Sequence, residues 1–571
     1  RFQVKAPRVW LDTRPDLRPP APDDLSPTMI PYLKAHPYRL HVPGVYGVLA
    51  GSSMAPVILL ENGPLHPQSG DLYPSLETAW EGAKPMRQMH WLWQIWELWP
   101  VLRDLGVASS LLNLELVRVE GWRIRLRELA GDQGHPPALS TLAAVWQPLV
   151  QAAHPALVEP LTEVLAEMQP PNSGSSEAIS ALSARLNHIL LTQAAQVSLR
   201  VSLAGATSTG PTQPRNEDTC YPTRLEVPTP DGGTPCLAIV CDGVGGHDGG
   251  EVASQLAVQS LQLQLRGLLS EAQSESQVLP PDIIKQQIEA VIRIANDVIN
   301  HQNDQQSRAE RQRMGTTLAL AVLVPQRIQT ANGWSRVDEL YIAHVGDSRV
   351  YWITPDYCHL LTVDHDIAAR EVIAARQLLP LAQERPDGGA LTQAIGTRSA
   401  DYLHPTVQRF ILDETGVLLL CSDGLSDNQR VEEAWANYIG LIVKDIVSLE
   451  SAVASWIELA NQKNGHDNTA VVLMHCKATT RAAAPLATDI ADRQQLPPTE
   501  LTAASRALLY GETAAEPESA SAQTGGFRVR SLPWWVWLIS AAILIAGGLS
   551  LLTILRPAGE PDPLPPIERS P

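Results

Sequence analysis

The chain has 571 residues and a formal net charge of −18 at pH 7. It is too long for one ordinary domain, so two or three domains are expected. The acidic balance argues against a general nucleic-acid-binding surface, because phosphate backbones require clustered Lys and Arg. We therefore expect no nucleic-acid partner. The chain begins at Arg1 rather than Met, as a fragment or a processed product would.

The cysteines favour a reducing environment. None of them forms a C-x-x-C pair, which would indicate a zinc site or a redox centre. Most of them fall in strand-like or motif segments, where a thiol packs as a small apolar group. We interpret them as reduced core thiols of a cytosolic domain. The six cysteines are Cys220, Cys236, Cys241, Cys358, Cys421 and Cys476.

Residues 1–195 are expected to form a mostly helical regulatory region. Apolar runs at 42–49 and 56–62 predict an antiparallel strand pair, and residues 116–129 predict a hairpin. Apolar spacing predicts helices at residues 31–36, 85–105, 140–153, 156–168 and 175–194. The tryptophans of the second helix are interpreted as core rather than as a ligand cage. Pro100 is expected to kink or end that helix.

This order of elements resembles a eukaryotic-type protein kinase that has lost its catalytic parts. Residues 56–62 stand where a kinase hinge would be. Leu111 stands where the catalytic aspartate belongs, and Leu116 where the metal-binding asparagine belongs. Glu128–Ala130 replaces Asp-Phe-Gly, and neither a Gly-rich phosphate loop nor a strand lysine is present. The resemblance implies a degenerate, non-catalytic kinase-like domain, and a helical regulatory domain of another kind remains the alternative.

Residues 196–478 repeat one pattern, in which a buried strand ends in an aspartate. Asp242, Asp347 and Asp423 each follow an apolar run, and Asp467 directly precedes one. Strand ends that face the same side would collect these carboxylates in one acidic pocket. Such a pocket is unfavourable unless cations neutralise it. Oxygen ligands without Cys or His suit Mg²⁺ or Mn²⁺.

Six ordered segments of residues 196–477 carry a family resemblance. The segments NED, DGVGGHDGGE, GTT, GDSR, SDGL and GHDN resemble the bacterial metal-dependent protein phosphatases, the type 2C Ser/Thr phosphatases. The resemblance implies an α+β fold, a β-sandwich of two antiparallel sheets flanked by helices. It implies a protein-serine/threonine phosphatase in which a water bound by Mn²⁺ or Mg²⁺ attacks phosphoserine or phosphothreonine directly. Phosphorylated proteins and a Ser/Thr kinase are the implied partners.

The resemblance also implies a role for each carboxylate of the first metal site. Asp242 would bridge two metal ions, and Gly243 would offer its backbone carbonyl. Asp423 and Asp467 would complete the first ion's ligands. Asp242 is therefore expected to act in catalysis as well as in metal binding.

Further residues extend the implied site. Glu217 would contact the second metal ion, partly through water, and Asp218 would orient a metal-bound water. Asp347 would help to hold a third ion. Arg349 would be structural. Residues 379–391 match the flap, which shapes substrate access in this family.

Two departures from the family pattern bear on phosphate binding and acid catalysis. Gln213 stands where the family places a phosphate-binding arginine, and Arg215 is expected to substitute for it in catalysis. Val244 stands where animal members carry a histidine, and His247 is interpreted as structural. Asp366 replaces the serine of a D-H-S run. Gln213 keeps an alternative open, a catalytically weak phosphatase-like protein that binds phosphoproteins or acts as a scaffold.

The C-terminal part is expected to anchor the protein. Residues 479–531 have no sustained apolar period and are typical of a flexible linker. Residues 534–555 carry no charge and are long enough to span a bilayer, so 532–556 is predicted as a transmembrane helix, with a buried soluble helix as the alternative. Arginines before the span favour a cytoplasmic catalytic domain in the bacterial inner membrane, with a tail at 557–571 outside.

Overall fold

The protein is described by a computed structural model in which Arg1–Ala483 form one compact unit and Ala484–Pro571 a second. The described residues are 2–480 except 16, 23, 50–55, 68, 171–173, 229–235, 245–248, 275–277, 310–311 and 331–332. The expected transmembrane helix and tail, and all but the first residues of the expected linker, lie outside them. Within the described ranges, no helix is both long and apolar enough to cross a membrane.

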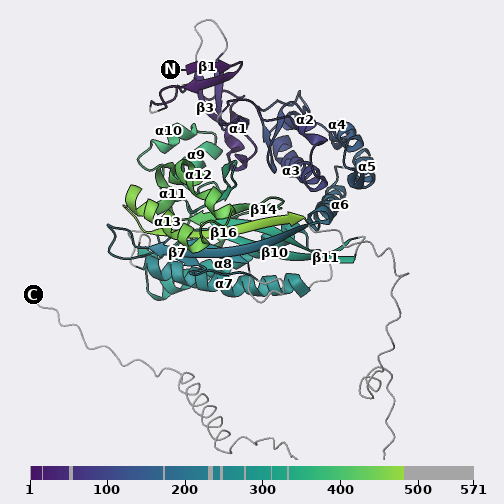
Figure 1. Cartoon of the computed structure of the whole chain (residues 1–571). Coiled ribbons are helices and arrows are strands. Elements are labelled where there is room, and N and C mark those ends of the chain that lie inside the picture. Colours follow the sequence, from purple (N-terminus) through teal and green to yellow (C-terminus); the bar gives the residue numbers. More distant parts are fainter. Residues whose placement is uncertain are drawn as a thin grey trace, which may run out of the picture. The chain divides into compact units, whose positions relative to one another are not determined.

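Two five-stranded antiparallel sheets form the centre of the fold (Figure 1). The first has the order β14 (Thr406–Phe410), β11 (Gly333–Val345), β10 (Leu318–Thr330), β9 (Leu237–Cys241) and β8 (Thr219–Tyr221). The second has the order β13 (Cys358–Leu360), β12 (Arg349–Ile353), β15 (Gly416–Cys421), β16 (Thr469–Thr480) and β7 (Val197–Ser208). The expected sandwich of two antiparallel sheets is confirmed.

Strand β10 shows why the sheets stack as they do. Its side chains alternate between two faces, as the pleat requires. Ala319 and Ala321 face the second sheet, in a core that includes Leu418 and Val472. Leu320, on the other face, packs in a core built with the flanking helices. Each sheet therefore has one face in the sandwich and one face under helices.

The helices cover the outer faces of the sandwich. Helices α7 (Gly250–Ser274) and α8 (Pro281–Gln305) lie along the first sheet, and Figure 1 shows them below the strands. Helices α11 (Asp423–Ser426), α12 (Arg430–Val443) and α13 (Leu449–Lys463) cover the second sheet. The sequence analysis did not predict α12, α13 or β14.

The N-terminal region has the expected mixture of helices and strand pairs. Its helical elements are α1 (Ile30–Lys34), η1 (His36–Tyr38), α2 (Leu76–Trp80), α3 (Pro85–Asp104), η2 (Ala108–Leu111), α4 (Leu139–Gln151), α5 (Pro155–Met168) and α6 (Ser176–Ala194). Its strands pair as β1 (Phe2–Ala6) with β2 (Val9–Asp12), β3 (Gly44–Leu49) with β4 (Val57–Glu61), and β5 (Val117–Glu120) with β6 (Arg123–Leu126).

Helix α3 does not end at Pro100 but runs on to Asp104. Pro100 removes one helical hydrogen bond and is costly inside a helix. Trp99 and Leu102 are buried on either side of it, however, and tertiary packing outweighs the local preference. The tryptophans of this helix lie in the core, as expected.

The N-terminal region and the sheets share apolar packing. Ile328, Val337 and Ile411 of the sheet region belong to the same core as the side chains of α3 and α6. At the tip of the β5–β6 hairpin, Trp122 packs edge-on against Phe410, with ring centroids 5.6 Å apart and an interplanar angle of 86°. Residues 1–195 therefore contact the sandwich through buried side chains.

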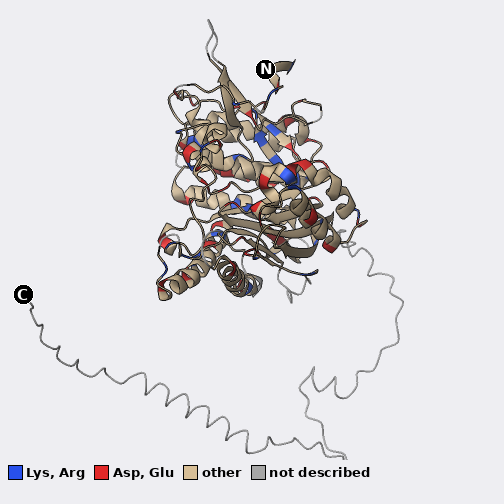
Figure 2. Cartoon of the chain, turned by 90° about the vertical axis from the view of Figure 1, so that its left-hand side faces the viewer, with Lys and Arg blue, Asp and Glu red and all other residues tan. Residues whose placement is uncertain are grey.

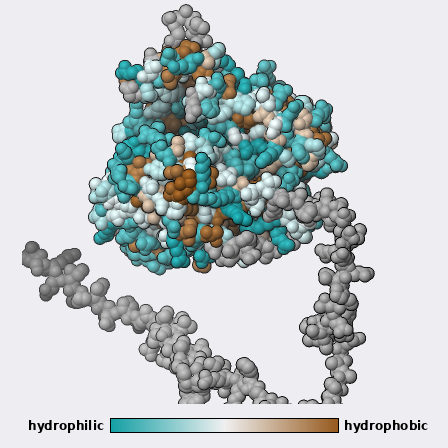
Figure 3. All heavy atoms as spheres, viewed as in Figure 1, coloured by the Kyte–Doolittle hydropathy of each residue, from teal (hydrophilic) through white to brown (hydrophobic). Residues whose placement is uncertain are grey.

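The surface carries mixed charge. Figure 2 shows basic and acidic residues interspersed on the side that it draws, rather than a continuous basic stripe. In Figure 3, hydrophilic residues cover most of the visible face, and apolar residues gather near its middle.

All six cysteines are free, and four of them are fully buried in or beside the strands.

Candidate active site

The carboxylates of the strand ends converge on one pocket. It has a volume of about 290 Å³. Its lining comes from both sheets and from the loops that follow β9, β11 and β15. It contains every residue expected to bind metal, namely Glu217, Asp242, Gly243, Asp347, Asp423 and Asp467. Gln213, Arg215 and Leu391 complete its polar and apolar walls.

Asp242 is held at the end of β9 by backbone contacts. Its N–H donates to Thr317 Oγ1 over 3.1 Å. Its carbonyl accepts from Thr316 Oγ1 over 2.7 Å and from the Thr317 N–H over 2.8 Å. These bonds tie the strand end to the start of β10. The hydroxyls of the two threonines of the GTT segment therefore fix the backbone of Asp242.

Two glycines let Glu217 approach the strand end. A Cβ on Gly250 would lie 2.3 Å from Glu217 Oε2, and a Cβ on Gly243 would lie 2.6 Å from the Gly250 carbonyl carbon. The Gly243 N–H donates to the Glu217 carbonyl over 3.2 Å. Side-chain-free residues are therefore needed at both positions. The remaining glycine-rich residues 245–248, with His247, lie outside the described residues.

Asn468 joins the loop that carries Glu217 to the start of β16. Its Oδ1 accepts from the Glu217 N–H over 2.8 Å. Its Nδ2 donates to the carbonyl of Arg215 over 2.9 Å. From the sequence, Asn468 had no assigned role beyond being the last residue of the GHDN segment. Its function is structural, because it brings Glu217 to the neighbouring Asp467.

Asp218 lies behind the pocket rather than in its lining. It is 5% exposed, and its Oδ2 accepts from Ser422 Oγ over 2.7 Å. Ser422 Oγ in turn accepts from the Ala470 N–H over 2.9 Å. This contact connects Asp218 to the residue before Asp423. The sequence analysis assigned no role to Ser422.

The buried carboxyls resist ionisation. Burial raises the pKa of Asp242 well above its usual value, and the charges of Asp218, Asp423 and Asp347 raise it further. Burial raises the pKa of Asp218 and of Asp347 to about 8, and that of Asp423 to about 6. A set of like charges in one buried site favours a bound cation.

The donor set fits Mg²⁺ or Mn²⁺. Its side chains supply oxygen alone, as these ions prefer. Asp218 Oδ1 and Asp423 Oδ1 are buried without a hydrogen-bond partner among the described residues. Within the described ranges, no group of three or more Asp, Glu, His or Cys side chains is close enough together to hold a metal ion. Repulsion between the carboxylates is consistent with that spacing.

Gln213 and Arg215 have different surroundings at the mouth of the pocket. Gln213 Nε2 donates to the His466 carbonyl over 2.9 Å and to Asp467 Oδ1 over 3.3 Å. The Arg215 side chain is 72% exposed, and its Nη1 lies 3.7 Å from Glu251 Oε1. Among the described lining residues, Arg215 is the one cation. Gln213 therefore supports Asp467, whereas Arg215 is accessible to a ligand.

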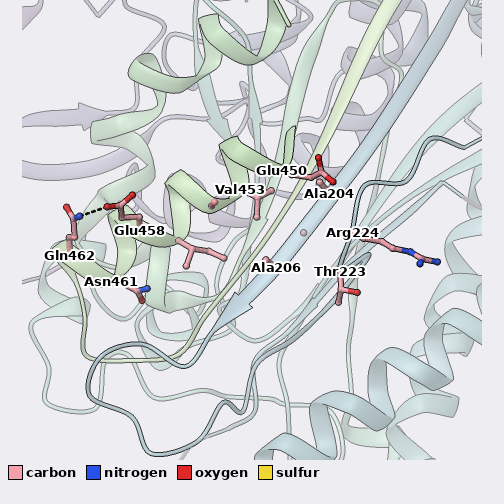
Figure 4. Close-up of a pocket in the computed structure, with 12 residues that line it drawn as sticks. Ala204, Ala206, Thr223, Arg224, Glu450, Val453, Glu458, Asn461 and Gln462 are labelled. Atoms are coloured by element: carbon pink, nitrogen blue, oxygen red, sulfur yellow. Dashed lines mark hydrogen bonds between the residues drawn. The ribbon is translucent and has the colours of Figure 1, made fainter. Parts of the chain in front are cut away.

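A second hollow lies elsewhere in the fold. It has a volume of about 510 Å³ and lies between β7 and α13, where Glu450 and Glu458 come from a single helix (Figure 4). In Figure 4, Gln462 bonds Glu458 along that helix. The hollow contains none of the strand-end aspartates, so the smaller pocket is the candidate active site.

Comparison with known proteins decides the family. The sequence profile of the family described as Protein phosphatase 2C matches residues 215–473. Protein phosphatase PhpP of Streptococcus pneumoniae is 30% identical over 239 residues, which are 42% of this chain and 85% of that protein. The chain belongs to the protein phosphatase 2C family. It is a protein-serine/threonine phosphatase of that type, which confirms the resemblance inferred from the motifs.

Other relatives of this phosphatase cover the same part of the chain. Serine/threonine phosphatase stp of Listeria welshimeri is 30% identical over 240 residues, 42% of this chain and 83% of that protein. The crystal structure of Serine/threonine phosphatase Stp1 from Staphylococcus aureus is 26% identical and covers 48% of this chain and 94% of that one, with a TM-score of 0.36. The family match begins at residue 215, so the kinase-like interpretation of residues 1–195 stays a prediction.

Proposed function

We propose that this phosphatase hydrolyses phosphoserine and phosphothreonine in proteins, with Mn²⁺ or Mg²⁺ in the carboxylate pocket and water as the nucleophile. The observation that carries this proposal is the convergence of Glu217, Asp242, Asp423 and Asp467 on one pocket. They come from separate segments of both sheets. Their mutual repulsion makes this arrangement unfavourable unless cations bind there.

The chain's own residues define the metal positions. Asp242, Asp423 and Asp467, with the Gly243 carbonyl, would hold the first ion, and Glu217 the second. Asp347 would hold a third ion. When bound, such ions lower the pKa of water and neutralise charge on phosphoryl oxygens.

Water is the favoured nucleophile because the described lining offers no free hydroxyl or thiol, and its carboxylates are assigned to metal binding. Among its described lining residues there is no Ser or Cys, and Thr317 Oγ1 is already bonded to the Asp242 N–H and to Ser348 Oγ. Asp218 Oδ1 is unpartnered, while its Oδ2 is fixed by Ser422. From its place behind the lining, Asp218 would help to orient a water in the pocket, as the family resemblance implies.

Arg215 is the proposed phosphate ligand. Its guanidinium is exposed at the mouth and only loosely paired with Glu251. Charge-assisted bonds from a guanidinium to a phosphate are stronger than neutral ones. The Gln213 side chain is engaged with Asp467 and His466, so it supports the site rather than the substrate.

The test is hydrolysis of a phosphothreonine peptide and of p-nitrophenyl phosphate by the purified chain, with Mn²⁺, Mg²⁺ or EDTA. Hydrolysis is expected only with metal, and Asp242→Asn is expected to lower kcat/KM at least about 10²-fold. Asp338→Asn, at a carboxylate outside the pocket, serves as the control. Peptide binding without turnover in any metal would instead support the phosphoprotein-binding alternative.

We further propose that residues 532–556 anchor the phosphatase in the bacterial inner membrane with its catalytic domain in the cytoplasm. The support is the uncharged stretch 534–555 and the arginines before it. Fractionation of cells that express the chain with and without residues 532–571 tests it. Recovery of both forms in the soluble fraction would rule the anchor out.

The substrate chemistry also implies a partner. Each phosphoserine or phosphothreonine must come from a Ser/Thr kinase, so we propose that one acts on the same proteins.

We retain the division into a regulatory region at 1–195, a phosphatase at 196–478 and a linker at 479–531. ATP titration of the first region would test whether it binds nucleotide, and no kinase turnover is expected of a degenerate kinase-like domain.

A further inference from the structure

The expected flap, residues 379–391, is part of a longer segment that leads directly into the carboxylate pocket. This segment, residues 366–391, is called the flap below, and its two ends lie side by side because Asp366 and Leu391 form a backbone bridge. The Ile367 N–H donates to the Ala390 carbonyl over 3.0 Å. Leu391 lines the pocket. A shift of this segment would therefore change the pocket wall.

The flap contains two short helices, α9 (Ile367–Ile373) and α10 (Leu379–Gln383). Asp366, which replaces a serine of the family pattern, caps α9, since its Oδ1 accepts from the Ala369 N–H over 2.6 Å. The flap thus has a folded apolar side of its own.

That apolar side packs against the N-terminal region. Helix α1 and the turn η1 contact α9, and β3 contacts α10. Figure 1 shows α9 and α10 on the side of the sandwich where α1 and β3 lie. Leu33 of α1 and Val372 of α9 are each 2% exposed and belong to one core. Leu378 and Ala382 of the flap are buried in the same core.

A polar side chain lies at the same contact. His36 of η1 is buried, and η1 packs on α9. Behind the flap, Asp364 Oδ2 accepts from Arg349 Nη2 over 2.6 Å, so Arg349 is engaged in a structural ion pair two residues after Asp347. The N-terminal region therefore contacts the flap through η1 as well as through α1 and β3.

We propose that residues 29–49 are a positioning element that holds the flap against the carboxylate pocket and so determines which phosphorylated polypeptides reach it. This proposal rests on the phosphatase function proposed above. A small phosphomonoester would contact only the carboxylates and Arg215, whereas a phosphorylated polypeptide would extend beyond the pocket over the flap, whose end, Leu391, forms part of the wall. The N-terminal region is therefore expected to act on polypeptide substrates selectively.

The test compares two alanine variants of the full chain. Leu33→Ala weakens the contact between α1 and the flap. Leu161→Ala is the matched control, because Leu161 is buried in the same core but lies on α5, which packs on α3, α4 and α6. Leu33→Ala is expected to change kcat/KM for a phosphothreonine peptide about fivefold or more through KM, with p-nitrophenyl phosphate hydrolysis unchanged. The control is expected to leave the ratio of the two activities unchanged.

Equal changes for both substrates in Leu33→Ala, or a ratio like that of Leu161→Ala, would overturn the proposal. Trypsin provides a readout that needs no activity, because Arg376 is exposed on the flap. Cleavage after Arg376 is expected to be about fivefold faster in Leu33→Ala than in the control. Equal cleavage would overturn the proposal even if the phosphatase proved inactive, and Leu33→Val replaces Leu33→Ala if that variant fails to fold.

Discussion

Arg87 of α3 and Asp413, which follows β14, form a two-point ion pair between the N-terminal region and the sandwich. Arg87 Nε lies 2.6 Å from Asp413 Oδ2, and Nη2 lies 2.8 Å from Oδ1. Both side chains are largely buried. Asp413 follows Phe410 by three residues, and Phe410 packs on Trp122, so this segment is joined to the N-terminal region by both a polar and an apolar contact.

Loss of this pair is expected to destabilise the whole unit. Arg87→Ala leaves a buried Asp413 carboxylate without its partner, at a cost of about 2–3 kcal/mol in the free energy of unfolding. Urea denaturation measures the change. Arg293→Ala, which breaks a more exposed pair with Glu289, is the control and is expected to cost about 0.5 kcal/mol or less. Equal costs for the two variants would show that the interface is weakly held.

The carboxylate cluster predicts opposite effects of one substitution with and without metal. In EDTA, Asp242→Asn is expected to raise the midpoint of thermal unfolding, because it removes one of several buried like charges. For the unsubstituted chain, Mn²⁺ at about a hundred times its dissociation constant is expected to add about 2.7 kcal/mol of stability. Asp242→Asn should lose that gain. A variant that still gains it would place the ions elsewhere.

Arg215 and Gln213 are expected to differ in what they contribute to turnover. Arg215→Gln removes the exposed cation of the pocket and should lower kcat/KM about tenfold or more. Gln213→Ala should instead weaken Mn²⁺ binding, because Gln213 donates to Asp467 Oδ1. Kinetics at several Mn²⁺ concentrations separate the two effects. If extra Mn²⁺ restores Arg215→Gln, the phosphate-binding assignment is wrong.

His90 is expected to make stability sensitive to acid. Burial, with the nearby charges of Arg87 and Arg409, lowers its pKa from 6.5 to about 3. Between these values the unfolded chain binds a proton that the folded chain excludes, so this group lowers stability as pH falls through that window. His90→Phe removes the effect and can still stack on Trp122. The unfolding midpoint of His90→Phe minus that of the unsubstituted chain should therefore be greater at pH 5 than at pH 7. A difference that does not change with pH would contradict this.

Much of the site could be predicted because its residues are local to strand ends. Asp242, Asp347 and Asp423 follow buried runs that any buried strand requires, and the structure places all three in one pocket. Ser422 and Asn468 could not be given roles in advance. Their partners, Asp218 and Glu217, are more than 200 residues away, since the sequence separation is 204 for the first pair and 251 for the second.

The sequence by itself determined the carboxylates at the strand ends, because apolar runs that end in aspartate are local patterns, and its ordered motifs carried the family resemblance that implied the antiparallel sandwich. Only the tertiary structure decided that α3 continues through Pro100, that Gln213 is bonded to Asp467, and that α1 packs on the flap. Each of these depends on side chains brought together from distant segments, and their packing outweighs the local preference of any one residue.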